Sequence, residues 1–288
     1  GYFQNIDVSF GFRRLSIIDI DNGHQPMISD DKRYVLIFNG EIYNFKEIRK
    51  QLENFGYKFH TKSDTEVLLN AYKHWSEKCV DYLNGMFAFA IYDKKNKNVY
   101  IARDRLGIKP LYYAKVGSVF IFASEIKALL KFPGINKSAD YKALSSYLTF
   151  RYTYGNQSYF QNIKKLLPGH FVNIVPTEEN FIKYWTTPFY NKKIDHGEKY
   201  YIEKIDELLS SAVSKRLISD VPLGALLSGG LDSSIIVSLM SKNDNKINSY
   251  SIGFNHDGYD ESKYAKLVAD HCSTEHLHLN LSKENYVD

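Results

Sequence analysis

A serine- and glycine-rich segment stands where an apolar run gives way to a helical pattern. The apolar run spans residues 223–227, and the segment Ser-Gly-Gly-Leu-Asp-Ser-Ser follows it directly. The first N–H groups of a helix lack intrahelical partners and the helix dipole makes that end positive, so such a junction favours phosphate groups. Glycine lets the main chain approach a bound anion, and a carboxylate near a nucleotide can organise Mg2+. The predicted phosphate-binding residues are Ser228, Gly229, Gly230, Ser233 and Ser234, with Asp232 as the candidate Mg2+ ligand.

Two other site motifs are excluded for this segment. No Lys-Ser/Thr pair follows the second glycine, so it is not a Walker A loop, and the Gly-x-Ser-x-Gly of a nucleophile elbow is not spelled. A bare Gly-Gly turn between a strand and a helix is usually structural. The whole string after an apolar strand, however, resembles the PP-loop of ATP pyrophosphatases, which cleave ATP between its α and β phosphates to adenylate a substrate. We therefore expect nucleotide binding here.

The elements around this motif alternate between strand and helix. Helices are expected at residues 198–219, 233–242 and 261–271, and strands at 223–227, 249–254 and 276–279. This alternation predicts a parallel α/β sheet.

The first part of the chain is rich in short β-type runs and predicts stacked antiparallel sheets. Strands are expected at residues 12–20, 34–38, 86–92, 99–102, 110–114, 119–122, 170–175 and 181–185, and helices at 45–55, 65–75 and 125–132. Ser63 and Glu66 have the spacing of a capping box at the start of the second helix. A polar stretch at residues 186–197 reads as a linker, which gives predicted domains of 1–187 and 195–288.

Length and composition narrow the class of protein further. A chain of 288 residues suits about two domains, and 44% hydrophobic residues exclude a disordered chain. The net charge of +4 is small and does not imply a nucleic-acid partner. Two distant cysteines fit neither a disulfide framework nor a zinc site, and no apolar run approaches the ~20 residues of a membrane span. We expect a cytoplasmic protein without a membrane partner.

Further motifs, taken in order, connect the two halves. They are Arg13-Arg14-Leu15-Ser16-Ile17-Ile18-Asp19, Gly23-His24-Gln25-Pro26-Met27, Phe38-Asn39-Gly40-Glu41-Ile42-Tyr43-Asn44, Ser63-Asp64-Thr65-Glu66, Gly85-Met86-Phe87-Ala88-Phe89, Ala102-Arg103-Asp104-Arg105-Leu106-Gly107-Ile108-Lys109-Pro110-Leu111-Tyr112 and, before the serine-rich segment, Ser219-Asp220-Val221-Pro222-Leu223-Gly224. Together they resemble the glutamine-hydrolysing asparagine synthetase family over essentially the whole chain.

This resemblance implies a fold and a two-step reaction. The fold is an α+β N-terminal-nucleophile glutaminase sandwich with α/β/β/α layers, followed by the start of an α/β PP-loop domain with a parallel sheet. The glutaminase releases ammonia from glutamine, and the second domain uses ATP and aspartate to form an aspartyl-adenylate that ammonia attacks, giving asparagine, AMP and diphosphate. The implied small molecules are glutamine, aspartate and ATP with Mg2+, and a homodimer is possible.

The resemblance also implies roles for residues of the glutamine site. A guanidinium suits bidentate binding of the glutamine α-carboxylate, and fixed donors suit the oxyanion that forms when a thiolate attacks the amide. The implied residues are Arg14 for the carboxylate, the main chain of Leu15, Ser16, Ile17 and Ile18 for the pocket, Asn39 and Gly40 for the oxyanion hole, and Glu41 and Asp64 for the α-ammonium. Simpler alternatives remain: a surface ion pair for Arg14, a plain strand for 15–18, a hairpin turn for Asn39-Gly40, and helix-end charge for Asp64.

Other positions carry over to the nucleotide site and to the contact between domains. By family analogy Leu227, Ile252 and Gly253 contact adenine and ribose, at the carboxyl ends of parallel strands. The polar segment that includes Arg103, Asp104 and Lys109 is expected either to brace the domain interface or to form a surface loop.

The sequence departs from the family pattern at the nucleophile. The family uses a cysteine at the mature amino terminus, whose α-amine acts as its base. Gly1 is not a cysteine, and Cys79 and Cys272 are expected to be ordinary buried thiols. Phe12 stands where the family usually has His. We therefore expect a chain truncated at both ends and inactive in both half-reactions, although the parent protein is an enzyme.

Three alternatives stay open at this stage. A related amidotransferase could amidate another carboxylate in cell-envelope or secondary-metabolite synthesis. A PP-loop enzyme that modifies tRNA or nucleotides is disfavoured by the fused glutaminase motifs and the small net charge. The third is a non-catalytic protein that binds glutamine and ATP.

Overall fold

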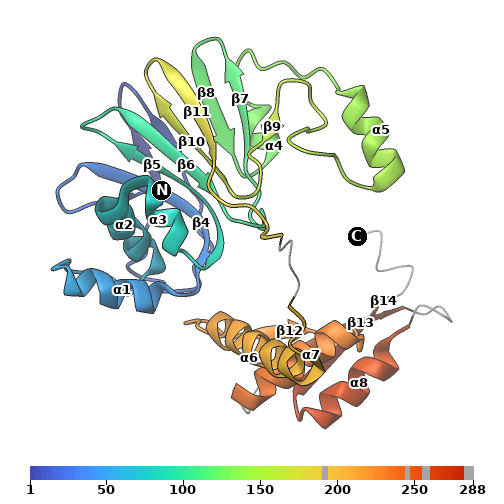
Figure 1. The fold of residues 1–288 in the computed structure, drawn as a ribbon. Coiled ribbons are helices and arrows are strands. Elements are labelled where there is room, and N and C mark those ends of the chain that lie inside the picture. The colour runs from blue at the N-terminus through green and yellow to red at the C-terminus, as the bar shows by residue number, and fades with distance from the viewer. Residues whose placement is uncertain (190–193, 244–246, 255–259, 282–288) are drawn as a thin grey trace. The chain divides into compact units, whose positions relative to one another are not determined.

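The computed structural model describes residues 1–189, 194–243, 247–254 and 260–281, and the chain divides into two compact units (Figure 1). Unit 1 is Gly1–Phe189 and unit 2 is Tyr190–Asp288. Each unit has its own hydrophobic core, and each is described by itself below.

Unit 1 is built on a six-stranded antiparallel sheet with the order β11-β10-β6-β5-β4-β3. Its strands are β3 (Met27–Ile28), β4 (Tyr34–Ile42), β5 (Gly85–Asp93), β6 (Asn98–Arg103), β10 (His170–Val175) and β11 (Glu178–Lys183). The strand β5 is buried from Phe87 to Asp93, on both of its faces. Successive side chains of a strand point to opposite faces, so this strand must have a packed layer on either side.

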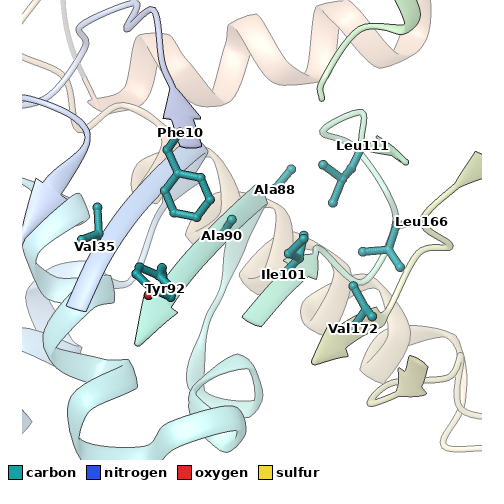
Figure 2. Packing of buried hydrophobic residues seen from close by; sticks show 9 residues of the cluster. All are labelled: Phe10, Val35, Ala88, Ala90, Tyr92, Ile101, Leu111, Leu166 and Val172. Atoms are coloured by element: carbon teal, nitrogen blue, oxygen red, sulfur yellow. The ribbon is translucent and has the colours of Figure 1, made fainter. Parts of the chain in front are cut away.

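A second sheet covers one of these faces. It has the order β8-β7-β9, with β7 at Tyr112–Val116, β8 at Val119–Ala123 and β9 at Lys164–Lys165, and a separate hairpin pairs β1 (Tyr2–Gln4) with β2 (Ser9–Gly11). Figure 2 shows the core that lies here, in which Ala88, Ala90 and Tyr92 of β5 meet Phe10 and Leu111. Tyr113, Phe120 and Phe122 of the second sheet pack against this cluster, so the two sheets share one core.

Helices cover the outer faces of unit 1. They are α1 (Phe45–Asn54), α2 (Asp64–Trp75), a 3-10 turn at Ser76–Lys78, α3 (Cys79–Tyr82), α4 (Ile126–Leu129) and α5 (Tyr141–Phe150). On the six-stranded sheet, Tyr72 of α2 lies against Tyr100 of β6 with ring centroids 5.2 Å apart. On the other sheet, Leu129 of α4 is buried with Ala114 of β7. The order of layers is therefore helix, sheet, sheet, helix, as the sequence predicts.

Unit 2 is a short parallel sheet with helices. Its elements are α6 (Glu198–Arg216), β12 (Gly224–Leu226), α7 (Leu231–Asn243), β13 (Asn248–Phe254), α8 (Ser262–His271) and β14 (Glu275–Leu281), and the strands pair in parallel in the order β12-β13-β14. Val213 of α6, Val237 of α7 and Ala265 of α8 share one buried cluster with Leu227. Among the described residues, none of the helices has the length and apolar character needed to span a bilayer.

The predicted strand at residues 12–20 is wrong. Residues 12–17 have no regular structure, and residues 18–20 form a bend and the start of a turn. The apolar residues of this segment mimic a strand, but Leu15 is 87% exposed and Asp19 has a positive φ of 50°. The guanidinium of Arg14 donates to the main-chain carbonyls of residues 18–20, which curls the chain into a loop.

Smaller differences concern the ends of elements. The sequence analysis did not find α5, and the expected strand at 181–185 is β11 at Glu178–Lys183. Ser63 caps α2 as predicted, since its hydroxyl accepts from the Thr65 N–H at 2.9 Å. The second half of the capping box is wrong, because the Glu66 carboxylate instead accepts from the N–H groups of His60 and Thr61 in the preceding loop.

Candidate functional site

A cavity of about 580 Å3 in unit 1 collects most of the predicted glutamine-site residues. Its walls come from the loop after β2, the end of β4, the start of α2 and the end of β8, which are far apart in sequence. Eight of the nine predicted residues line it: Arg14, Leu15, Ile17, Ile18, Asn39, Gly40, Glu41 and Asp64. Ser16 is the exception, being half-buried outside the lining.

Asn39 and Gly40 lie within β4 and not in a turn. They pair with Ala88 and Phe87 of β5, so the hairpin-turn alternative is wrong. The side-chain amide of Asn39 donates to the Ser124 hydroxyl at 3.2 Å. A Cβ atom added to Gly40 would lie 2.1 Å from the Met86 carbonyl oxygen, so only glycine fits where β4 crosses β5.

Asp64 is a buried carboxylate that joins α2 to β4. Its side chain accepts a hydrogen bond from the Ile42 N–H at 3.1 Å, and the residue is 5% exposed. Burial raises the pKa of Asp64 from 3.8 to about 6, and the negative charge of Glu41 acts in the same direction. Asp64 is therefore more than helix-end charge, because Ser63 is the cap and Asp64 faces the cavity.

The loop that carries Arg14 is held to the segment before α2. The guanidinium of Arg14 lines the cavity while its NH groups donate to the carbonyls of residues 18–20. Asp19 in turn accepts from the Lys62 N–H at 2.6 Å and from Asn22. Burial opposes ionisation of Asp19, but these hydrogen bonds outweigh it and lower the pKa of the carboxyl group. The loop is thus organised before any ligand is present.

Several residues of the cavity wall were not predicted. These are Gln25, Thr65, Lys109, Ser124, Glu125 and Lys127. Gln25 and Lys109 belong to motifs that the sequence analysis singled out without placing them in the site, whereas the residues at the end of β8 carry no local signal. The Lys127 ammonium pairs with the Glu125 carboxylate at 2.5 Å.

The polar segment after β6 braces its own loop in unit 1. Arg103 is buried and donates to the carbonyls of Lys109 and Gly107 at 2.7 Å and of Leu166 at 2.6 Å. Asp104 accepts N–H groups from the same loop, including that of Lys109 at 3.0 Å. The surface-loop alternative is wrong for these two side chains, which position Lys109 at the cavity.

Neither cysteine lines the cavity. Cys79 is fully buried, and burial holds the pKa of its thiol well above the ordinary value. Cys272 is half-buried against the core of unit 2. The expectation of a buried, unreactive thiol is confirmed for Cys79.

The glycine- and serine-rich segment of unit 2 connects β12 to α7, as predicted. Leu227 is buried, and its N–H donates to the Tyr250 carbonyl of β13 at 2.7 Å. Gly229 has a φ of 80°, and an added Cβ would lie 2.5 Å from main-chain atoms of Tyr264 and Ala265 at the start of α8. This glycine is therefore required by the packing of α8 as well as by the turn.

Hydroxyl groups order the turn at the start of α7. The Ser228 and Ser233 hydroxyls are 3.0 Å apart, and the hydroxyls of Ser233 and Ser234 donate to the Gly230 carbonyl at 3.1 and 2.7 Å. The main chain of the turn enters α7, so the N–H groups at the helix start and these hydroxyls form a set of donors that suits an anion.

Ile252 and Gly253 lie at the carboxyl end of β13, next to β12. Ile252 is 50% exposed, whereas Gly253 is buried and an added Cβ would lie 2.5 Å from the His278 ring. Asp232 is an exposed residue of the first turn of α7. The described residues hold no group of three or more metal-ligating side chains, so Asp232 suits Mg2+ only together with nucleotide phosphates.

Comparison with known families places this chain in a class. Residues 1–185 match the family model described as a glutamine amidotransferase domain, and residues 204–288 match the model described as asparagine synthase. The chain belongs to the class II glutamine amidotransferase family and continues into the start of an asparagine synthase domain. Unit 1 therefore has the N-terminal-nucleophile fold, and unit 2 is the start of a PP-loop domain.

The similar proteins are asparagine synthetases. The chain is 40% identical, over all of its length, to asparagine synthetase [glutamine-hydrolyzing] 1 of Bacillus subtilis and covers 45% of that protein. It is 37% identical to asparagine synthetase [glutamine-hydrolyzing] 3 of the same organism, over 98% of this chain and 48% of the relative. It is 34% identical to the asparagine synthetase [glutamine-hydrolyzing] of Zea mays, over 98% and 44%. The chain thus spans about half the length of these relatives.

Proposed function

We propose that this chain forms the glutamine-binding unit, and the leading part of the ATP-dependent unit, of a glutamine-hydrolysing asparagine synthetase. The observation that carries the proposal is the cavity of unit 1, which brings eight of nine predicted residues to one place. The relatives' names support the choice of asparagine as the product.

The cavity has the charges that an α-amino acid needs. Arg14 offers a guanidinium for the α-carboxylate, and Glu41 and Asp64 offer carboxylates for the α-ammonium. Because the pKa of Asp64 is about 6 without ligand, its carboxylate is largely ionised at neutral pH and loses its charge below that value. Binding of the ammonium group should therefore weaken as the pH falls through 6.

Asn39 and Gly40 provide donors for the reacting amide. When a thiolate attacks the amide carbon of glutamine, negative charge develops on the amide oxygen, and fixed donors stabilise that charge. One N–H of the Asn39 amide is directed by Ser124, which limits rotation of the other toward or away from the oxyanion. The thiolate would come from an amino-terminal cysteine outside residues 1–288, since neither Cys79 nor Cys272 lines the cavity.

The turn from Ser228 to Ser234 would hold the phosphates of ATP. Leu227, Ile252 and Gly253 lie at the adjoining strand ends, where adenine and ribose would be held. Bound Mg2+ would supply positive charge to the phosphates, with Asp232 as its protein ligand. In the complete protein, ATP would activate aspartate as an acyl-adenylate that ammonia converts to asparagine.

Calorimetric titration of the 288-residue chain tests the glutamine site. We expect L-glutamine to bind at pH 8, D-glutamine not to bind, and L-glutamine affinity to fall about tenfold or more in Asp64→Asn. Equal binding of both enantiomers, or none of L-glutamine, would refute the site. In the complete protein, aspartate-dependent exchange of labelled diphosphate into ATP tests the acceptor, and dependence on a different carboxylate would replace asparagine as the product.

A further inference from the structure

Gln25 is a buried polar side chain in the wall of the cavity. It is 7% exposed, and none of the roles assigned so far uses it. Burying an amide costs free energy unless its donors and acceptor are all engaged, so its partners show what it does.

Both ends of the Gln25 amide bind the main chain of Phe38. The oxygen Oε1 accepts from the Phe38 N–H at 2.6 Å, and the nitrogen Nε2 donates to the Phe38 carbonyl at 3.1 Å. An N–H needs an acceptor and a carbonyl needs a donor, so this pair of bonds fixes which end of the amide is oxygen.

The side chain continues the sheet where β3 does not reach. The strand β3 pairs with β4 only at Val35 and Leu36, while Phe38 lies two residues further along β4. The Gln25 amide takes the position of the next strand residue on that edge. It therefore holds β4 straight up to the residue before Asn39.

A third bond connects Gln25 to the other half of the site. Nε2 also lies 3.3 Å from the Thr65 hydroxyl, and Thr65 follows Asp64 at the start of α2. One amide thus contacts the residue next to the predicted oxyanion donors and the residue next to the predicted ammonium ligand. All of these residues line the cavity.

We propose that Gln25 is a positioning residue that fixes the distance between the oxyanion segment Asn39-Gly40 and the ammonium ligand Asp64. The proposal rests on the proposed glutamine site and adds a residue through which its two parts are held in register. Without the amide, Phe38 would lose its partners on that edge, and α2 would lose its link through Thr65.

The test compares Gln25→Met, which removes all three bonds at similar length, with Gln25→Glu, which keeps the acceptor for the Phe38 N–H but has no donor for its carbonyl when ionised. Gln161→Glu is the matched control, because the Gln161 amide also donates to a main-chain carbonyl, at 3.1 Å, but lies outside the cavity wall. Each 288-residue variant is titrated with L-glutamine, and amide hydrogen exchange is measured at Phe38. Unfolding followed by tryptophan fluorescence establishes that each variant is folded.

We expect Gln25→Met to bind L-glutamine about tenfold more weakly and to exchange the Phe38 amide about tenfold faster. Gln25→Glu should show the same loss at pH 8, and its affinity relative to the native chain should recover toward pH 5.5, where a protonated carboxyl group can donate again to the Phe38 carbonyl. Protonation of Asp64 weakens both proteins alike, so the ratio isolates residue 25. A general loss of stability would lower affinity without this recovery.

The outcomes separate this inference from the proposed function. If the native chain binds L-glutamine and folded Gln25→Met binds it equally well, the positioning role is refuted and the glutamine site stands. A Gln25→Glu ratio that does not change with pH also refutes it. If the native chain does not bind L-glutamine, the proposed function fails first.

Discussion

Replacing Asp64 by Asn should stabilise unit 1 at neutral pH while weakening its ligand binding. In the folded chain the carboxyl group is 5% exposed and its pKa rises from 3.8 to about 6. That difference corresponds to ~3 kcal/mol that ionisation of Asp64 takes from the stability of the folded state at pH above 6. The asparagine side chain keeps an oxygen acceptor for the Ile42 N–H but never ionises.

The sign of the pH dependence follows from the raised pKa. The folded chain holds the Asp64 proton more tightly than the unfolded chain, so its contribution is fully present below pH 3.8 and is lost as the pH rises through 6. The stability of Asp64→Asn minus that of the native chain should therefore grow from pH 4.5 to pH 7.5. We expect about 1–3 kcal/mol at the upper end, since the amide reproduces the carboxylate only in part.

Urea unfolding followed by tryptophan fluorescence measures this difference. Both tryptophans of the chain, Trp75 and Trp185, lie in unit 1, so the signal reports on the unit that contains Asp64. Asp93→Asn is the control of opposite sign, because Asp93 is held by Arg33 through two hydrogen bonds of 2.8 and 2.6 Å and its pKa is lowered despite burial. Asp93→Asn should be destabilised at pH 7.5. A difference for Asp64→Asn that is flat with pH, or negative at pH 7.5, would refute the reasoning.

Three further changes have defined outcomes. Cys79 should resist iodoacetamide in the native chain and react only after unfolding in urea, because it is fully buried; peptide mass spectrometry checks this against Cys272. Gly229→Ala should destabilise unit 2 by at least about 2 kcal/mol, since its Cβ would clash with the main chain of α8, and circular dichroism during thermal unfolding measures the loss. Ser124→Ala should weaken L-glutamine binding by less than tenfold, because it frees the Asn39 amide without removing it, and calorimetry would contradict this with a complete loss.

The sequence predicted most strands and helices because their hydrophobic periods are local. The buried strand β5 and the junction of β12 with α7 follow from such runs, and the motifs located eight of the nine glutamine-site residues in one cavity. The loop of residues 12–20 could not be predicted in the same way. Its shape depends on hydrogen bonds from Arg14 to its own carbonyls and from Lys62 to Asp19, which a hydrophobic pattern does not encode.

Other parts of the site depend on contacts between distant segments. Ser124 reaches Asn39 across 85 positions, and Gln25 reaches Thr65 across 40. Spacing along the chain carries no information about such pairs, so Ser124 was missed and Gln25 had no assigned role. The burial of Asp64, which sets its pKa, likewise follows from the assembled sheet and not from its neighbours in sequence.

The way the cavity wall is distributed along the chain has a consequence for biosynthesis. The wall runs from Gly11 to Ala128, and the sheet beneath it is completed only when β10, at His170–Val175, pairs with β6. A growing polypeptide emerging from the ribosome would thus carry its first strands for more than a hundred residues before this pocket could close. During that interval the apolar segments of β4 and β5 would have to be shielded by chaperones or by each other.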